Sequence, residues 1–277
     1  MKRNIKTLYF SATDTTKKVV TELAGSLAAR MNGAAGISQF DFTLPEARQV
    51  VRSYAGDDVV VVGVPVYAGR VPNVLVKYLH TLQGNGALAV AVVVYGNRDY
   101  DDALLELTDL LTEQNFTVIA GGAFVGEHSF SRTLGAQRPD EKDITIVRDF
   151  AGQIYSKLTT QTSFPPIAVK GNHPYKKYYA PRDKQGNKIS DFHLIKPKTS
   201  DDCIDCKLCA EVCPMGSIDY DQPSVMIGIC IKCCACIRQC PVGAKQFTDL
   251  GFLSHVRMLE RTLTHRSEPE LFFAETQ

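Results

Sequence analysis

The sequence predicts an α/β domain with a doubly wound, five-stranded parallel sheet, followed by a small α+β domain rich in cysteine. Two observations lead to this prediction. Over the first 160 residues, short apolar runs alternate with segments of helical period, which is typical of a parallel sheet with helices on both faces. All nine cysteines then fall between residues 203 and 240.

The expected strands are apolar enough to be buried on both faces. They cover residues 5–10, 37–42, 58–63, 87–95 and 116–124. Helices are expected over about 16–31, after Leu44-Pro45, and over 73–82, 99–113 and 141–157. Five strands rather than six favour the order 2-1-3-4-5, in which a ligand binds at the carboxyl ends of the strands beside the switch point.

The loop after the first strand is rich in hydroxyl groups and leads directly into a helix. Its candidate binding residues are Ser11, Thr13, Asp14, Thr15 and Thr16. Their hydroxyl and backbone N–H groups would meet the positive end of a helix dipole, where a phosphate binds well. The same residues also fit an ordinary N-cap, so this loop alone does not decide between the two interpretations.

The loops after the third and fourth strands each pair an aromatic residue with a glycine. The candidates are Pro65, Val66, Tyr67, Ala68 and Gly69 in the first loop, and Tyr95, Gly96, Asn97, Arg98 and Tyr100 in the second. A flat ligand could stack on such aromatics while backbone groups approach its edge. Either tyrosine alone fits an ordinary strand end, but three loops in register favour a bound flavin mononucleotide.

The loop after the fifth strand contains the candidate proton donor His128, among Glu127, Ser129, Ser131 and Arg132. An imidazole near a flavin or a substrate could pass a proton. The alternative is that His128 only fastens the loop.

Two cysteine repeats each read CxxCxxCxxxCP, the pattern of bacterial proteins with a pair of 4Fe-4S clusters. In that pattern the fourth cysteine of each repeat ligates the other cluster. Cluster one would take Cys203, Cys206, Cys209 and Cys240, and cluster two Cys230, Cys233, Cys236 and Cys213. Zinc or disulfides are the disfavoured alternatives, because a zinc knuckle needs only two cysteines. Cys234 is surplus and is expected to pack beside cluster two.

Several segments together resemble one known family. They are YFSATDTTKKV, GVPVYAGRVP, VYGNRDYDDALLEL, GEHSFSR with RPDEKD, and CIDCKLCAEVCP with CIKCCACIRQCPVGA. The chain resembles the flavodoxin-plus-ferredoxin fusion family of anaerobic bacteria and archaea. The resemblance implies non-covalent FMN, with its phosphate in the Ser11 to Thr16 loop and its ring between the Tyr67 and Tyr95 loops. Asp14 stands where that family usually has glycine, and its charge is expected to weaken FMN binding.

We expect four regions: a flavodoxin-like domain at 1–160, a basic linker at 161–196, a two-cluster ferredoxin domain at 197–250, and an amphipathic helix and tail at 251–277. The net charge of +1 gives no indication of nucleic-acid binding. The beginning MKRNIKTLYF has no signal-peptide pattern and no run is long enough to span a membrane, so a soluble, cytoplasmic chain is expected.

The predicted function is electron transfer between FMN and two 4Fe-4S clusters in anaerobic-type metabolism, coupling two-electron to one-electron chemistry. The alternative is a flavin-dependent reductase of a quinone or nitro compound, fed by the clusters. A nicotinamide fingerprint GxGxxG is absent. The expected partner is a redox protein or a small-molecule electron donor or acceptor, and a homodimer is left open.

Overall fold

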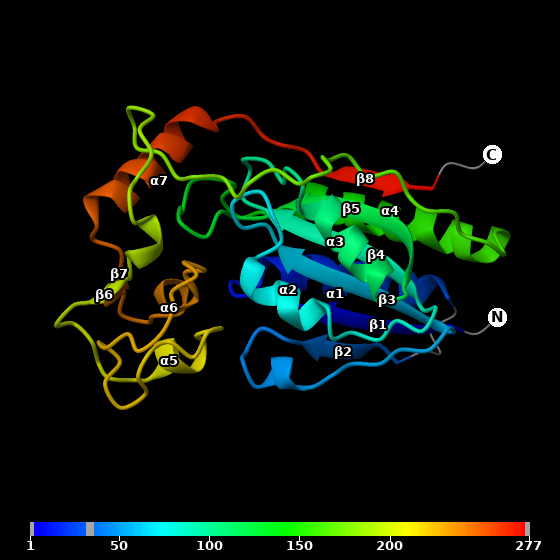
Figure 1. Ribbon diagram of the computed structural model, residues 1–277, viewed down its shortest axis with the longest axis horizontal. Coiled ribbons are helices and arrows are strands. Elements are labelled where there is room, and N and C mark those ends of the chain that lie inside the picture. Colours follow the sequence, from blue (N-terminus) through cyan, green and yellow to red (C-terminus); the bar gives the residue numbers. More distant parts are fainter. Residues whose placement is uncertain (1–2, 32–35, 275–277) are drawn as a thin grey trace.

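The larger part of the molecule is a domain built on a six-stranded sheet in the order β2-β1-β3-β4-β5-β8. The computed structural model describes residues 3–31 and 36–274. The strands are β1 (Asn4–Tyr9), β2 (Ser38–Asp41), β3 (Asp58–Pro65), β4 (Leu88–Tyr95), β5 (Thr117–Val125) and β8 (Glu270–Phe273). The first five are parallel, in the order that the sequence predicted. The sixth, β8, pairs antiparallel with β5 and was not predicted (Figure 1).

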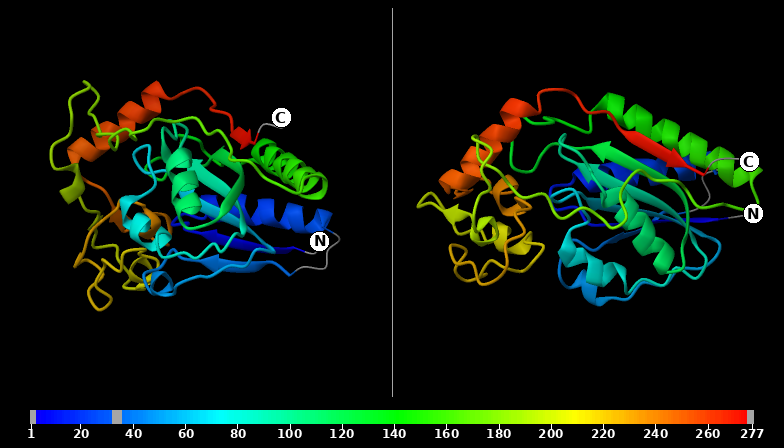
Figure 2. Two further views of the ribbon diagram at one scale, coloured as in Figure 1. Left: turned by 45° about the vertical axis from the view of Figure 1, so that its right-hand side comes forward. Right: turned by 45° about the horizontal axis from the view of Figure 1, so that its top comes forward.

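Two layers of helices cover the sheet, as Figure 2 shows. The helices α1 (Thr15–Arg30) and α4 (Glu141–Thr160) pack on one face, and α2 (Asn73–Leu79) and α3 (Ala103–Glu113) pack on the other. Close contact between α1 and the sheet depends on Gly63, because a Cβ there would lie 2.3 Å from Val20 Cγ2.

The prediction of a helix after Leu44-Pro45 was wrong. The structure has only a single 3-10 turn, η1 (Ala47–Gln49), and Val50 after it is extended. The Arg48 guanidinium donates hydrogen bonds to the carbonyl oxygens of Phe42 and Thr43, which fastens this turn to the preceding loop. The β-branched pair Val50-Val51 then favours extended backbone over a continued helix.

The segment between the two parts lies along the α2 and α3 side of the sheet domain. It contains the short turn η2 (Phe192–Leu194) and an antiparallel bridge between Arg182 and Lys188. Tyr175 and Tyr178 lie against the Arg70 guanidinium, with ring centroids 4.5 and 5.1 Å from its Cζ.

The cysteine-rich part is small and has little regular structure. It consists of β6 (Lys198–Thr199) paired with β7 (Lys245–Gln246), and of the short helices α5 (Leu208–Glu211) and α6 (Ala235–Arg238). The longer helix α7 (Leu250–Thr262) follows, where an amphipathic helix was expected. It leads from the cysteine-rich part back to the sheet, where the chain adds β8 (Figure 1).

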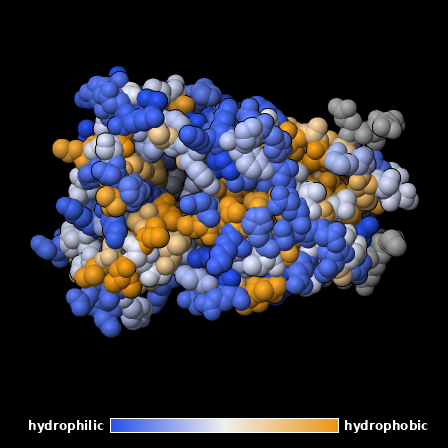
Figure 3. Space-filling model, in the orientation of Figure 1, coloured by the Kyte–Doolittle hydropathy of each residue, from blue (hydrophilic) through white to orange (hydrophobic). Residues whose placement is uncertain are grey.

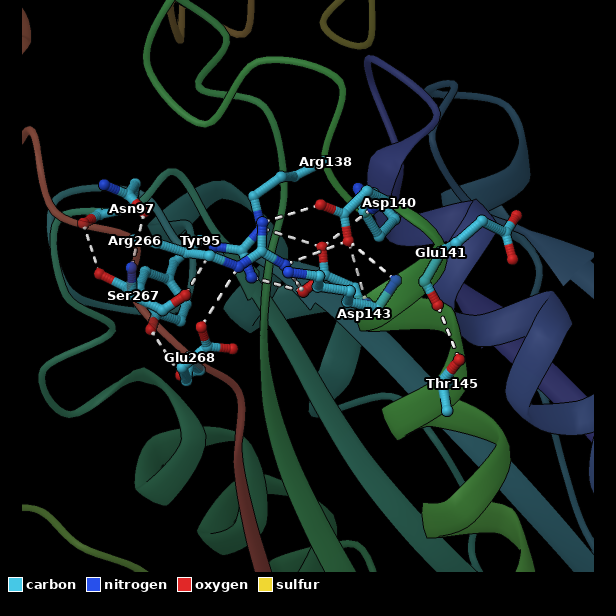
Figure 4. A network of polar contacts seen from close by, with 12 residues as sticks. Tyr95, Asn97, Arg138, Asp140, Glu141, Asp143, Thr145, Arg266, Ser267 and Glu268 are labelled. Atoms are coloured by element: carbon cyan, nitrogen blue, oxygen red, sulfur yellow. Dashed lines mark hydrogen bonds and ion pairs between the residues drawn. The ribbon is translucent and has the colours of Figure 1, made fainter.

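A network of ion pairs fastens this return segment to the start of α4 (Figure 4). Arg138 pairs with the buried carboxylate of Asp143 and donates a hydrogen bond of 2.6 Å to the carbonyl oxygen of Ser267. Arg266 pairs with Asp140, Asp143 and Glu268. Across the two described ranges, no helix is long and apolar enough to cross a membrane.

Candidate functional site

A cavity of about 520 Å³ lies beyond the carboxyl ends of the parallel strands, between the sheet domain and the cysteine-rich part. Its walls include residues from the loops after β1, β3, β4 and β5, as the switch-point rule predicts. Figure 3 shows apolar patches along the junction of the two parts, on a face that is otherwise mainly hydrophilic.

The loop after β1 forms one wall, with Ser11, Ala12, Thr13, Thr15 and Thr16 lining the cavity. The hydroxyl oxygen of Ser11 accepts a hydrogen bond from the Lys17 N–H at 3.0 Å, which holds the loop against the first turn of α1. No helical carbonyl precedes the first-turn amides of Thr15 and Thr16, so these N–H groups are available to an anion.

Asp14 belongs to this loop but does not line the cavity. Its backbone is left-handed, with φ of 62°, and its side chain is 64% exposed. The nearest cation is Lys17, whose Nζ lies 4.0 Å from the Asp14 carboxylate. The Asp14 carboxylate, which was expected to lie beside the FMN phosphate, is therefore turned toward solvent.

The loops after β3 and β4 form a second wall. Pro65, Val66, Tyr67, Ala68, Tyr95, Gly96 and Arg98 line the cavity. Gly96 has to be glycine, because a Cβ there would lie 2.5 Å from the ring of His128. Burial raises the pKa of Tyr67 well above its ordinary value, and the thiols of the second cysteine repeat act in the same direction.

Three further candidates from these loops lie outside the cavity wall. Asn97 donates hydrogen bonds to the carbonyl oxygens of Leu263 and His265, and so binds the segment after α7. Tyr100 is a core residue whose hydroxyl donates to Glu270 at 2.8 Å. A Cβ on Gly69 would collide with Asp101. Asn97 and Tyr100 lie outside the cavity wall because they bind the C-terminal segment where it returns to the sheet. The sequence did not reveal this return.

His128 lines the cavity, and its Nδ1 accepts a hydrogen bond of 3.2 Å from the Phe130 N–H. The proton of the neutral ring is therefore on Nε2. Burial, with smaller contributions from the cations His255, Arg238 and Arg98, lowers the pKa of His128 to about 4. At neutral pH the ring is uncharged and donates only through Nε2.

Arg238 of α6 holds the His128 loop against the cysteine-rich part. It pairs with the Glu127 carboxylate and donates to the carbonyl oxygens of His128 at 2.7 Å and Ser129 at 3.2 Å. Arg132, in the same loop, has an exposed side chain whose Nη1 lies 4.0 Å from Glu127, and Ser131 donates a hydrogen bond to Glu260 of α7.

The rest of the wall comes from segments that the sequence did not connect with this site. The linker, the second cysteine repeat and α7 together supply Tyr179, Pro181, Ile189, Asp191, Phe192, His193, Ile231, Lys232, His255 and Leu259. Ile231 and Lys232 lie between the first two cysteines of the second repeat, and the other residues belong to no motif. Their one sequence signal is the apolar spacing of α7, which indicates a buried face but not what the face covers.

The cysteines surround two smaller cavities in the crossed arrangement that the repeats predict. One is lined by Cys213, Cys230, Cys233 and Cys236 together with the surplus Cys234, and the other by Cys203, Cys206, Cys209 and Cys240. Four thiols around one cavity fit a cluster that takes one thiolate at each iron. In the part of the chain that the structure describes, no three His, Cys, Asp or Glu side chains are grouped to hold a single metal ion. Cys234 is buried beside Phe247 and Phe252.

We call the cavity lined by Cys213, Cys230, Cys233 and Cys236 the cavity of the Cys213 set, and the one lined by Cys203, Cys206, Cys209 and Cys240 the cavity of the Cys203 set. The large cavity and the cavity of the Cys213 set share a wall. Cys230, Ile231 and Lys232 line both. The cavity of the Cys203 set has no lining residue in common with the large cavity. Of the two cysteine cavities, only that of the Cys213 set therefore adjoins the large cavity.

Residues 149–252 match the sequence model of the 4Fe-4S dicluster domain. Together with the strand order, this match decides the architecture. The chain is a flavodoxin-like domain fused to a 4Fe-4S dicluster domain. No curated protein matches this fusion protein.

Three solved structures resemble the sheet domain of the fusion protein. A flavodoxin from the domain Archaea is 13% identical with a TM-score of 0.40, and the match covers 56% of this chain and 99% of that one. A Streptococcus pneumoniae flavodoxin is 18% identical with a TM-score of 0.38, over 55% of this chain and 98% of that one. An NADH:FMN oxidoreductase in its apo form is 16% identical with a TM-score of 0.43, over 58% and 93%. The strand order, rather than these distant likenesses, establishes the flavodoxin-like fold.

Proposed function

We propose that the fusion protein is an electron-transfer flavoprotein of anaerobic-type metabolism, which passes electrons between FMN and two 4Fe-4S clusters and on to a redox partner. The observation that carries this proposal is the wall shared by the large cavity and the cavity of the Cys213 set. A flavin in the first cavity and a cluster in the second would be separated by only a few residues.

The residues that would hold the flavin follow from the cavity wall. The Ser11 to Thr16 loop, with the first-turn amides of α1, would hold the phosphate. Tyr67 and Tyr95 would flank the ring, and Gly96 leaves room for His128 at its edge. The wall from the linker and α7 would exclude water from the ring.

The residues that would hold the clusters are the two crossed sets of cysteines. Cluster two would bind Cys213, Cys230, Cys233 and Cys236, and cluster one Cys203, Cys206, Cys209 and Cys240. Flavin exchanges electrons in pairs or singly, whereas each cluster carries one. Cys203 and Cys206 are exposed, so electrons would enter or leave at cluster one.

An anaerobic cofactor inventory with a redox titration tests this proposal. We expect FMN and about eight iron atoms per chain, with flavin and cluster signals that change together when a one-electron reductant is added. A chain that binds zinc in place of iron, or clusters that are reduced without any change in the flavin, would refute it.

The second candidate function, a reductase of a small oxidant, is favoured by the position of His128 in the cavity wall. In this function, Nε2–H of the neutral ring would donate a hydrogen bond to the flavin edge or to the oxidant. Replacing His128 with Ala should slow turnover of a quinone while iron and flavin contents stay the same. His80, an exposed histidine that does not line the cavity, provides the matched control. Equal rates for both variants would remove His128 from the mechanism.

A further inference from the structure

Lys232 is a buried cation in the wall between the large cavity and the cavity of the Cys213 set. It is only 8% exposed, although lysine is rarely buried. Its Nζ donates hydrogen bonds to the carbonyl oxygens of His193 at 3.1 Å and Cys230 at 3.3 Å, and lies 5.3 Å from the ring centroid of Phe192.

Among the described residues, the ammonium group of Lys232 has no carboxylate partner, and its hydrogen bonds go only to backbone carbonyls. Two acidic residues line the large cavity: Asp191 is exposed, and Glu127 pairs with Arg238. A buried charge without a counter-charge is costly. The backbone carbonyls compensate only in part, so the position requires a negative charge from something bound beside it.

Comparison of the two cysteine repeats shows that this cation is particular to the second. Asp205 occupies the equivalent place in the first repeat, two residues after the first cysteine, with φ of 56° against 58° for Lys232. The Asp205 side chain is 65% exposed and pairs with Lys207 at 2.8 Å. Equivalent backbone positions therefore carry a solvated ion pair beside one cysteine set and a buried, unpaired cation beside the other.

Resting on the proposed function, we propose that Lys232 sets the reduction potentials of the flavin and of cluster two together. A cluster with four thiolates is an anion whose charge becomes more negative on reduction, and an added electron likewise makes the flavin more negative. A fixed positive charge in the wall between them favours the reduced form of both centres. Lys232 is thus a positioning charge for electron transfer and takes no part in bond breaking.

Lys245 provides a matched control. It is also a buried lysine bonded to a backbone carbonyl, that of Pro223, but it lines the cavity of the Cys203 set and not the large cavity. Its charge acts on the cluster cysteines Cys209 and Cys236. Neutralising Lys245 should therefore change cluster potentials and leave the flavin potential unchanged.

The experiment is an anaerobic redox titration of the full chain, following the flavin by absorbance and the clusters by electron paramagnetic resonance. The cluster signal absent from Cys213→Ala identifies cluster two. In Lys232→Gln, which keeps a hydrogen-bond donor, we expect the ratio of reduced to oxidised cluster two to fall about tenfold at a given potential, a shift of 59 mV. The flavin potential should fall in the same direction, and Lys232→Arg should restore both.

Unchanged potentials in Lys232→Gln, or an equal flavin shift in Lys245→Gln, would overturn the assignment to Lys232. If Lys232→Gln assembles no clusters, the flavin potential still decides, because the flavin loops belong to the sheet domain; an unchanged value refutes the inference. A wild-type chain without flavin or cluster iron refutes the proposed function itself, whereas a fully loaded chain with unshifted potentials refutes only the role of Lys232.

Discussion

Replacing Asp143 with Ala should destabilise the protein more than any exposed ion pair can. The Asp143 side chain is 0% exposed and that of Arg138 only 4%. The carboxylate accepts hydrogen bonds from Arg138 Nε at 2.9 Å, from Arg266 at 3.2 Å and from the Asp140 N–H at 2.9 Å. Removing it leaves the buried Arg138 guanidinium without an ion-pair partner among the described residues.

The magnitude follows from the cost of breaking a buried pair on one side. Such a change typically lowers the free energy of unfolding by about 3–5 kcal/mol. We expect a value in this range, because Arg138 also loses the geometry in which it binds the carbonyl oxygen of Ser267. That bond holds the segment leading from α7 to β8, so the loss should loosen the wall of the large cavity as well.

Urea unfolding of the loaded protein without oxygen provides the assay. The chain contains no tryptophan, so the transition is followed by far-UV circular dichroism. Glu22→Ala is the matched control, because it removes an exposed pair with Arg148 whose N–O distance is 2.7 Å. An exposed pair contributes at most about 1 kcal/mol. The reasoning fails if Asp143→Ala costs no more than Glu22→Ala.

Three further predictions concern the phosphate loop, pH and the clusters. Asp14→Gly should change the Kd of FMN by less than about threefold, because the carboxylate faces solvent; a tenfold tightening in a fluorescence titration would show that repulsion operates after all. Hydrogen bonding from Arg266 lowers the pKa of Asp140, so this pair stabilises the fold above about pH 4, the ordinary Asp pKa, and its contribution is lost as pH falls below that. Acid unfolding curves should therefore converge for the wild type and Arg266→Ala, and curves that separate further in acid would contradict this sign. Cys213→Ala should halve the iron content while Cys234→Ala retains it, and equal iron loss in both would disprove the ligand assignment.

The local patterns of the sequence predicted the parallel sheet well. Each of β3, β4 and β5 is a continuous apolar run, and residues of this kind are stable only where both faces of a strand are covered. The short strand β8 was missed because its four residues, ELFF, are too few to show a strand period. Its place in the sheet depends on pairing with β5, more than 140 residues earlier in the chain.

That the loops after β1, β3 and β4 line one cavity could be predicted for a similar reason. The carboxyl ends of parallel strands must meet at one edge of the sheet, so their loops meet as well. Asn97 and Tyr100 were misplaced because their side chains bind the returning C-terminal segment. The direction in which Asp14 points was likewise beyond the sequence, because a left-handed residue can aim its side chain toward a ligand or away from it.

The sequence by itself determined the cysteine sets and the βα alternation, because ligand spacing and hydrophobic period are properties of neighbouring residues. Only the tertiary structure decided that α7 and the linker close the large cavity, and that Cys230, Ile231 and Lys232 form the wall between it and the cavity of the Cys213 set. These contacts join segments that are tens of residues to more than a hundred residues apart, and they depend on how two independently patterned parts pack. The physical reason is that the local pattern of a segment shows which of its faces is apolar but not which distant segment will cover that face.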